Sequence, residues 1–209
     1  MTSGFQRSSE SRYEAGKREW AAAFLEEIQG MIDCEFHAAS VHAEDKFPDS
    51  KEALAAELSD VLERIYSEYC TLQSEQKTGR LKWIYLSFLR SSMKDHYPAY
   101  RIDFYDERDC FSDQVCSGVW EFAFLFSHFD KIRNMVLDAF CHQSKVKEYE
   151  ADALLYALYD RFHDLASRLL SSLVEQKLIR ALDTSGGGTV TVREGGLFDK
   201  TEIIGQWGD

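Results

Sequence analysis

A block dense in aromatic and aliphatic residues constrains the fold of this chain more than any other feature. It runs from Leu81 to Phe129, and within it rings and branched side chains crowd around a short charged segment. Burying so many rings removes a large apolar area from water, which favours folding strongly. We therefore expect this block to form the interior of the domain, with the rest of the chain packed around it.

Length and composition are those of an ordinary globular protein. The chain has 209 residues, of which 29% are charged and 44% hydrophobic, enough for one well-buried domain. Its two prolines, Pro48 and Pro98, leave long stretches in which helices can run without interruption.

The charge balance limits the kinds of partner. With 24 basic and 36 acidic residues the formal net charge is -12, and such a chain repels nucleic-acid phosphates and anionic lipids. We therefore expect no nucleic-acid partner and no membrane association. The five cysteines are odd in number and form no Cys-x-x-Cys pair, which indicates thiols in a reducing compartment. The predicted location is cytoplasmic.

Helical periodicity dominates the pattern of apolar residues. It predicts five helices, over residues 9–45, 49–79, 81–93, 113–140 and 144–182. The segment 81–93 is apolar nearly all round, so a buried strand also fits, but helix is favoured because the run ends at a proline. Residues 100–105 alternate between apolar and charged, which predicts an extended piece.

The composition changes near the C-terminus. Gly186, Gly187 and Gly188 end the last helix, and Thr189–Val192 has the pattern of a strand. The predicted fold is mainly α, an irregular bundle of about five helices with a small C-terminal β appendage. Residues 1–185 would form the helical domain, and residues 186–209 a β tail that docks on it or pairs with a partner.

The charged segment inside the aromatic block is the best candidate for a binding site. Charges flanked by rings are partly buried and therefore need partners. The candidate binding residues are Arg90, Tyr100, Arg101, Asp103, Tyr105, Asp106 and Arg108. Such a cluster suits either a pocket for a small ligand or a basic side chain, or a structural network of arginines and carboxylates. The structural interpretation is favoured.

Signals for metal binding or catalysis are weak. Three pairs have helical spacing for metal ligands: Cys34 with His37, Asp138 with His142, and Asp160 with His163. The repeated Glu-x-x-His pattern of di-iron bundles is absent, and so are the sequence motifs of nucleophilic and phosphate-binding sites. We therefore expect no metal, no cofactor and no catalytic residue, with His37, His142 and His163 as weak metal candidates.

Three functions fit these observations. The favoured one is a cytoplasmic, non-enzymatic interaction or regulatory module that binds another protein, or itself, through the C-terminal strands. The first alternative is a small helical enzyme that depends on a metal or a small molecule. The second is a sensor that binds an apolar ligand in the aromatic block.

Overall fold

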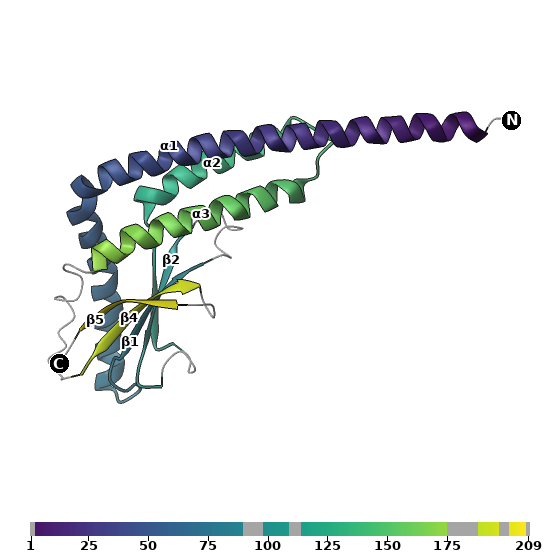
Figure 1. The fold of residues 1–209 in the computed structure, drawn as a ribbon. Coiled ribbons are helices and arrows are strands. Elements are labelled where there is room, and N and C mark those ends of the chain that lie inside the picture. Colours follow the sequence, from purple (N-terminus) through teal and green to yellow (C-terminus); the bar gives the residue numbers. More distant parts are fainter. Residues whose placement is uncertain (1–2, 90–97, 109–113, 175–187, 197–200, 208–209) are drawn as a thin grey trace. The chain divides into compact units, whose positions relative to one another are not determined.

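The structure is a computed structural model that describes residues 3–89, 98–108, 114–174, 188–196 and 201–207. It contains helices and a mixed five-stranded sheet, in the order α1 β1 β2 β3 α2 α3 β4 β5 (Figure 1). The helices are α1 (Ser3–Ser74), α2 (Ala123–Cys141) and α3 (Glu148–Val174). The strands are β1 (Trp83–Phe88), β2 (Tyr100–Tyr105), β3 (Cys116–Trp120), β4 (Val190–Gly196) and β5 (Thr201–Trp207). The predicted fold, a mainly α irregular bundle of about five helices, is therefore wrong.

The first correction concerns the apolar run predicted as a helix over 81–93. Its described part is strand β1, which lies between β2 and β4 and is buried on both faces. A strand covered on both sides reads as a continuous apolar run, and so does a fully buried helix. Periodicity therefore could not separate the two structures. The extended segment predicted over 100–105 is confirmed as β2.

The second correction concerns the helix predicted from residue 113. Strand β3 occupies Cys116–Trp120, and helix α2 begins only at Ala123. Phe122 adopts a φ of 45°, a conformation that bulky residues rarely take, and its carbonyl accepts hydrogen bonds from the amides of Leu125 and Phe126. This turn separates the strand from the helix within a sequence whose apolar residues look continuous.

The third correction concerns the break predicted at Phe47–Pro48. Helix α1 continues through Pro48, so the two helices predicted for 9–45 and 49–79 are one element. A proline inside a helix removes one backbone hydrogen bond and bends the helix, but packing of the flanking turns can retain it.

The sheet joins strands that lie far apart in sequence. Its order is β3-β2-β1-β4-β5; β4 is parallel to β1, and the other neighbouring strands are antiparallel. The chain passes from β3 through α2 and α3 before it returns as β4. The C-terminal strands are therefore part of the main sheet, and the prediction of a small β appendage to a bundle is wrong.

The helices and strands form two compact units. Unit 1 comprises Met1–Val41 and His128–Asp160, so it contains one part of each helix. Within it the ring of Phe24 meets the edge of Phe140 at 5.2 Å between centroids, and Phe129 meets Tyr159 at 5.6 Å. Unit 1 is thus an all-helical layer with an aromatic core.

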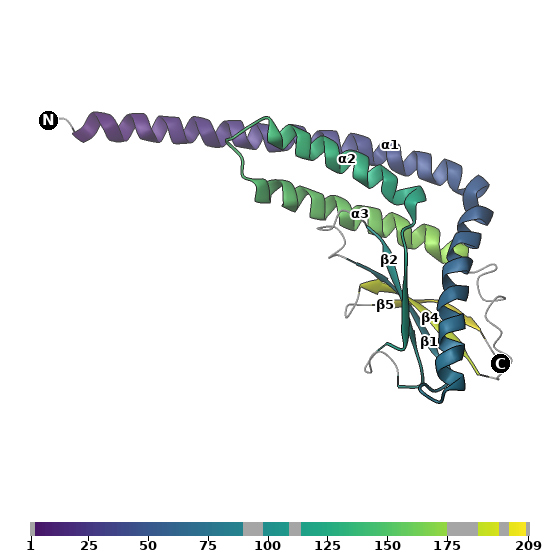
Figure 2. The same cartoon turned by 180° about the vertical axis from the view of Figure 1, so that it is seen from behind.

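Unit 2 comprises His42–Ser127 and Arg161–Asp209 and contains the whole sheet. Figure 2 shows the C-terminal part of α1 running alongside the strands. Tyr69 of α1 packs on Phe104 of β2, and His163 of α3 stacks on Phe88 of β1. Because Phe88 and Phe104 lie on the same face of the sheet, α1 and α3 cover one face together.

Most of the described residues of the aromatic block are buried, as the sequence predicts. Ile84, Phe104 and Phe129 have no exposed surface, and Trp120 and Phe126 are nearly as buried. In the described part of the chain, none of the helices is long and apolar enough to cross a membrane.

Candidate functional site

The alternation of strand β2 divides the predicted binding residues between two faces of the sheet. Arg101, Asp103 and Tyr105 share the face opposite to the one that the helices cover. Tyr100 lies on the helix-covered face, where its hydroxyl hydrogen-bonds to Glu194. Arg90 lies outside the described residues. The structure thus brings together only part of the predicted cluster.

Asp103 is the most unusual group on the face opposite the helices. Its side chain is fully buried, and its Oδ1 accepts a hydrogen bond of 2.8 Å from Nε of Arg101. Its other oxygen, Oδ2, is buried and has no hydrogen-bond partner. Burial raises the pKa of Asp103, and the Arg101 guanidinium opposes this only in part. The carboxyl group is therefore only half satisfied by the protein.

Arg193 of β4 joins Asp103 on this face. Its Cα is the register partner of Tyr85, and Tyr85 is in turn the register partner of Asp103, so the three form one row across the sheet. The guanidinium carbon of Arg193 lies 4.7 Å from the ring centroid of Trp83 and 5.9 Å from that of Tyr85. Its Nε is buried and has no hydrogen-bond partner.

We call this surface the polar face, and it combines charges with rings. Its members are Trp83, Tyr85, Arg101, Asp103, Tyr105 and Arg193. The sequence predicts the three residues on β2 as binding residues. It does not predict those on β1, whose apolar run predicts a helix, or Arg193 on β4. The alternation of Val190 and Val192 with Thr191 and Arg193 was the available signal for Arg193.

Asp106 and Arg108 form a separate cluster just after β2. The Arg108 side chain donates to Asp106 through Nε and Nη2, at distances down to 2.7 Å, and the backbone amides of Arg108 and Gly79 also donate to it. These hydrogen bonds, the Arg108 side chain foremost, hold the pKa of Asp106 well below its usual range. Thr78 donates to the same carboxylate at 3.2 Å. Asp106 therefore ties the turn after α1 to the end of β2, which is a structural role.

A further buried carboxylate, Glu194 of β4, lies on the helix-covered face. Its Oε1 is 2.7 Å from Oγ of Ser167, 3.0 Å from Nε2 of His163 and 3.3 Å from the hydroxyl of Tyr100. The His163 ring stacks on Phe88, with centroids 4.3 Å apart and planes 7° apart. Ser167 donates to the carboxylate and not to the imidazole, so this arrangement anchors α3 on the sheet and lacks the nucleophile–base contact of a catalytic serine.

Of the weak metal candidates, His37 and His142 belong to unit 1 and His163 to unit 2. His37 is exposed, and Nδ1 of the exposed His142 is 2.7 Å from the backbone oxygen of Asp138. His163 belongs to the Glu194 cluster. Among the residues that the structure describes, no three histidine, cysteine, aspartate or glutamate side chains come together as a metal site would need.

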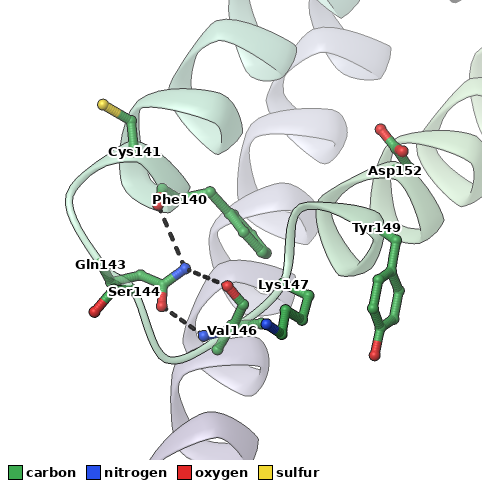
Figure 3. Close-up of a pocket in the computed structure, with 8 residues that line it drawn as sticks. All are labelled: Phe140, Cys141, Gln143, Ser144, Val146, Lys147, Tyr149 and Asp152. Atoms are coloured by element: carbon green, nitrogen blue, oxygen red, sulfur yellow. Dashed lines mark hydrogen bonds between the residues drawn. The ribbon is translucent and has the colours of Figure 1, made fainter.

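A pocket of about 660 Å³ opens at the turn between α2 and α3, within unit 1 (Figure 3). Figure 3 shows that the side chain of Gln143 bridges the two sides of the turn. Its Nε2 donates to the carbonyls of Phe140 and Val146, and its Oε1 accepts from the amides of Lys145 and Val146. Because the amide is used entirely to hold the turn, it leaves no hydrogen-bonding capacity for a ligand here.

No protein-family model, no curated protein and no solved structure matches the chain. The case for function therefore depends on the geometry described above.

Proposed function

We propose that this protein is a cytoplasmic, non-enzymatic interaction module that binds an extended segment of another protein along the outer edge of β5. The observation that carries the proposal is the position of β5 at the end of the sheet, with Ile203 exposed at 54%. An edge strand offers a row of backbone amides and carbonyls with which an incoming strand can pair.

The described residues of the β5 edge have some of the features that block strand addition and lack others. The pairing with β4 has a register shift between Val192 and Arg193, which is a β-bulge or a similar irregularity. Thr201–Trp207 is seven residues long and contains no proline and no lysine, the residues that proteins most often place on an edge to prevent pairing. Strand β3, at the opposite edge, has five residues, and its Gly118 is pressed against Ile65 of α1. The described sheet therefore offers one edge that is better suited to a partner strand than the other.

Charge indicates what kind of segment would bind. The chain carries a formal net charge of -12, so a basic segment is attracted, while a second copy of the chain and a nucleic acid are repelled. We therefore favour a basic, extended segment of a different protein over self-association.

The polar clusters support a non-enzymatic function. The Ser167 hydroxyl is bound to Glu194, and the Asp106 carboxylate is held by Arg108 and backbone amides. Groups engaged in this way stabilise the fold, and they leave no nucleophile or general base poised for reaction in these two clusters.

Phage-displayed decapeptides of basic, neutral and acidic composition test the proposal. Peptides selected on the full chain are expected to be basic. Their affinity for Ile203→Ser should be at least fivefold lower than for the native chain. The matched control is Val119→Ser, which removes a valine exposed at 50% at the opposite edge, on the same face of the sheet, and should leave the affinity unchanged.

Amide hydrogen exchange locates the bound peptide. Amides of β5 should become protected when the peptide binds, while those of β3 should not. Equal losses in both variants, or selected peptides that leave β5 unprotected, would contradict the proposal. A dimer in analytical ultracentrifugation that dissociates in Ile203→Ser would show that the occupant is a second copy, which also overturns it.

A further inference from the structure

Two polar atoms on the polar face lack partners although both are buried. They are Oδ2 of Asp103, an acceptor, and Nε of Arg193, a donor. Buried polar atoms without a partner cost about 1–3 kcal/mol each and are uncommon in folded proteins. A donor and an acceptor left open on one row of the same sheet indicate a molecule that supplies the complementary pair.

We propose that the polar face binds a small zwitterion, whose ammonium group pairs with Asp103 and whose carboxylate pairs with Arg193. The site adjoins β5, because Arg193 is the register partner of Ile203, but the proposal does not depend on strand addition. The ammonium group would donate to Oδ2 of Asp103 while Arg101 keeps Oδ1. The ligand carboxylate would accept from Nε of Arg193, and charge-assisted hydrogen bonds of this kind are the strong ones.

The register of the sheet sets the length of the ligand. Asp103 and Arg193 flank Tyr85, so their Cα atoms are about 10 Å apart, twice the spacing between neighbouring strands. Side chains stand roughly perpendicular to a sheet, so Oδ2 of Asp103 and Nε of Arg193 start from about the same separation as the Cα atoms. Hydrogen bonds of about 2.8 Å at each end then leave about 4–5 Å between the nitrogen and the carboxylate oxygen of the ligand. The guanidinium of Arg193 leans over the rings of β1 and lies nearer to Trp83 than to Tyr85. A short ω-amino acid fits, and a long one does not.

Aromatic rings complete the site. The rings of Tyr85 and Tyr105 meet edge to face at 5.4 Å, and Trp83 lies under the guanidinium of Arg193. Rings of this kind exclude water and attract a cation to their faces, so the ammonium end gains more than the contact with Asp103 alone. The side chains of Arg101, Trp83 and Arg193 are each partly exposed, and they are the ones that must move to admit the ligand.

The test uses a ladder of ω-amino acids with the intact chain. Glycine, β-alanine, 4-aminobutyrate and 6-aminohexanoate are titrated separately, and binding is measured by isothermal titration calorimetry. We expect β-alanine or 4-aminobutyrate to bind at least tenfold more tightly than 6-aminohexanoate. Asp103→Asn and Arg193→Gln should each weaken that binding at least tenfold.

Matched controls separate the site from general charge effects. Asp138→Asn and Arg168→Gln make the same changes at side chains exposed at 76% and 62%, and should leave the affinity unchanged. Circular dichroism checks that each variant is folded, and NMR shifts of the Trp83 indole follow binding in the native chain. The proposal is overturned if no member of the ladder binds at 50 mM. An affinity that does not depend on the length of the ω-amino acid, or that is unchanged in Asp103→Asn and Arg193→Gln, also overturns it.

Discussion

Gly118 of β3 provides a direct test of the packing between the sheet and α1. A Cβ atom added at this position would lie 2.7 Å from Cδ1 and 3.0 Å from Cγ1 of Ile65. Carbon atoms in favourable contact are about 3.5–4.0 Å apart, and Ile65 is only 2% exposed, so it has little room to retreat. Overpacking of a core costs about 1–3 kcal/mol, and Gly118→Ala should lower the free energy of unfolding by that amount.

A double-mutant cycle identifies the clash as the cause. Ile65→Val removes Cδ1 and by itself should cost about 0.5–1.5 kcal/mol, because it leaves a small cavity. In the Gly118→Ala background the same change removes the closest contact. The double variant should therefore lose less than the sum of the single losses, by about 1 kcal/mol.

Urea unfolding followed by circular dichroism measures each free energy. The control is Gly30→Ala within α1, where an added Cβ has no atom within 4 Å. An alanine in place of a glycine inside a helix should stabilise the protein by about 0.5–1 kcal/mol. If Gly118→Ala is neutral, or if the losses in the cycle add, then α1 does not pack on β3 as described.

Further predictions concern buried titratable groups. Burial raises the pKa of Tyr69 to about 12, so the folded state keeps this proton while the unfolded chain releases it near pH 10. The free energy of unfolding should therefore fall between pH 10 and 12 by up to about 3 kcal/mol relative to that of Tyr69→Phe, as urea unfolding would measure. Burial raises the pKa of Cys116 to about 11, so this thiol should react with iodoacetamide at pH 8 far more slowly than the exposed Cys34. Peptide mass spectrometry would measure both rates. Equal rates would mean that Cys116 on β3 is accessible to solvent. The pKa of Asp106 is lowered, so its stabilising effect is present above about pH 4 and is lost as the pH falls below that value. Asp106→Asn should therefore lower the free energy of unfolding more at pH 7 than at pH 2. An equal loss of stability at both pH values would contradict the role of Arg108.

The sequence predicted some elements of the fold well and others wrongly, for physical reasons. Strand β2 was predicted because its apolar and charged residues alternate, a period that only an extended chain produces. Strand β1 was missed because both of its faces are buried, which erases alternation. The partners of β1 lie far along the chain, and β4 is separated from it by two helices. Such pairing is a tertiary property that local patterns do not encode.

The same limit applies to the candidate sites. Arg101 and Asp103 were predicted as members of one charged cluster, and the structure joins them at 2.8 Å. Arg193 and Glu194 follow each other in sequence but point to opposite faces of the sheet, so each belongs to a different cluster. A search for nearby charges in the sequence could find Arg101 with Asp103. Assigning Arg193 and Glu194 to different clusters, by contrast, needed the strand register.

Two of the buried carboxylates, Asp103 and Glu194, differ in how completely the protein satisfies them. Glu194 receives hydrogen bonds from three side chains through one oxygen, whereas Asp103 receives one from Arg101 and has an unpaired oxygen. A satisfied buried carboxylate holds elements together, but a half-satisfied one lowers stability, because the desolvation of the charge is not compensated. Burial accordingly raises the pKa of Asp103, which means that the fold disfavours its charged form. A group that weakens the fold contributes something other than stability, and for this reason binding is to be sought at the polar face and not at the Glu194 cluster.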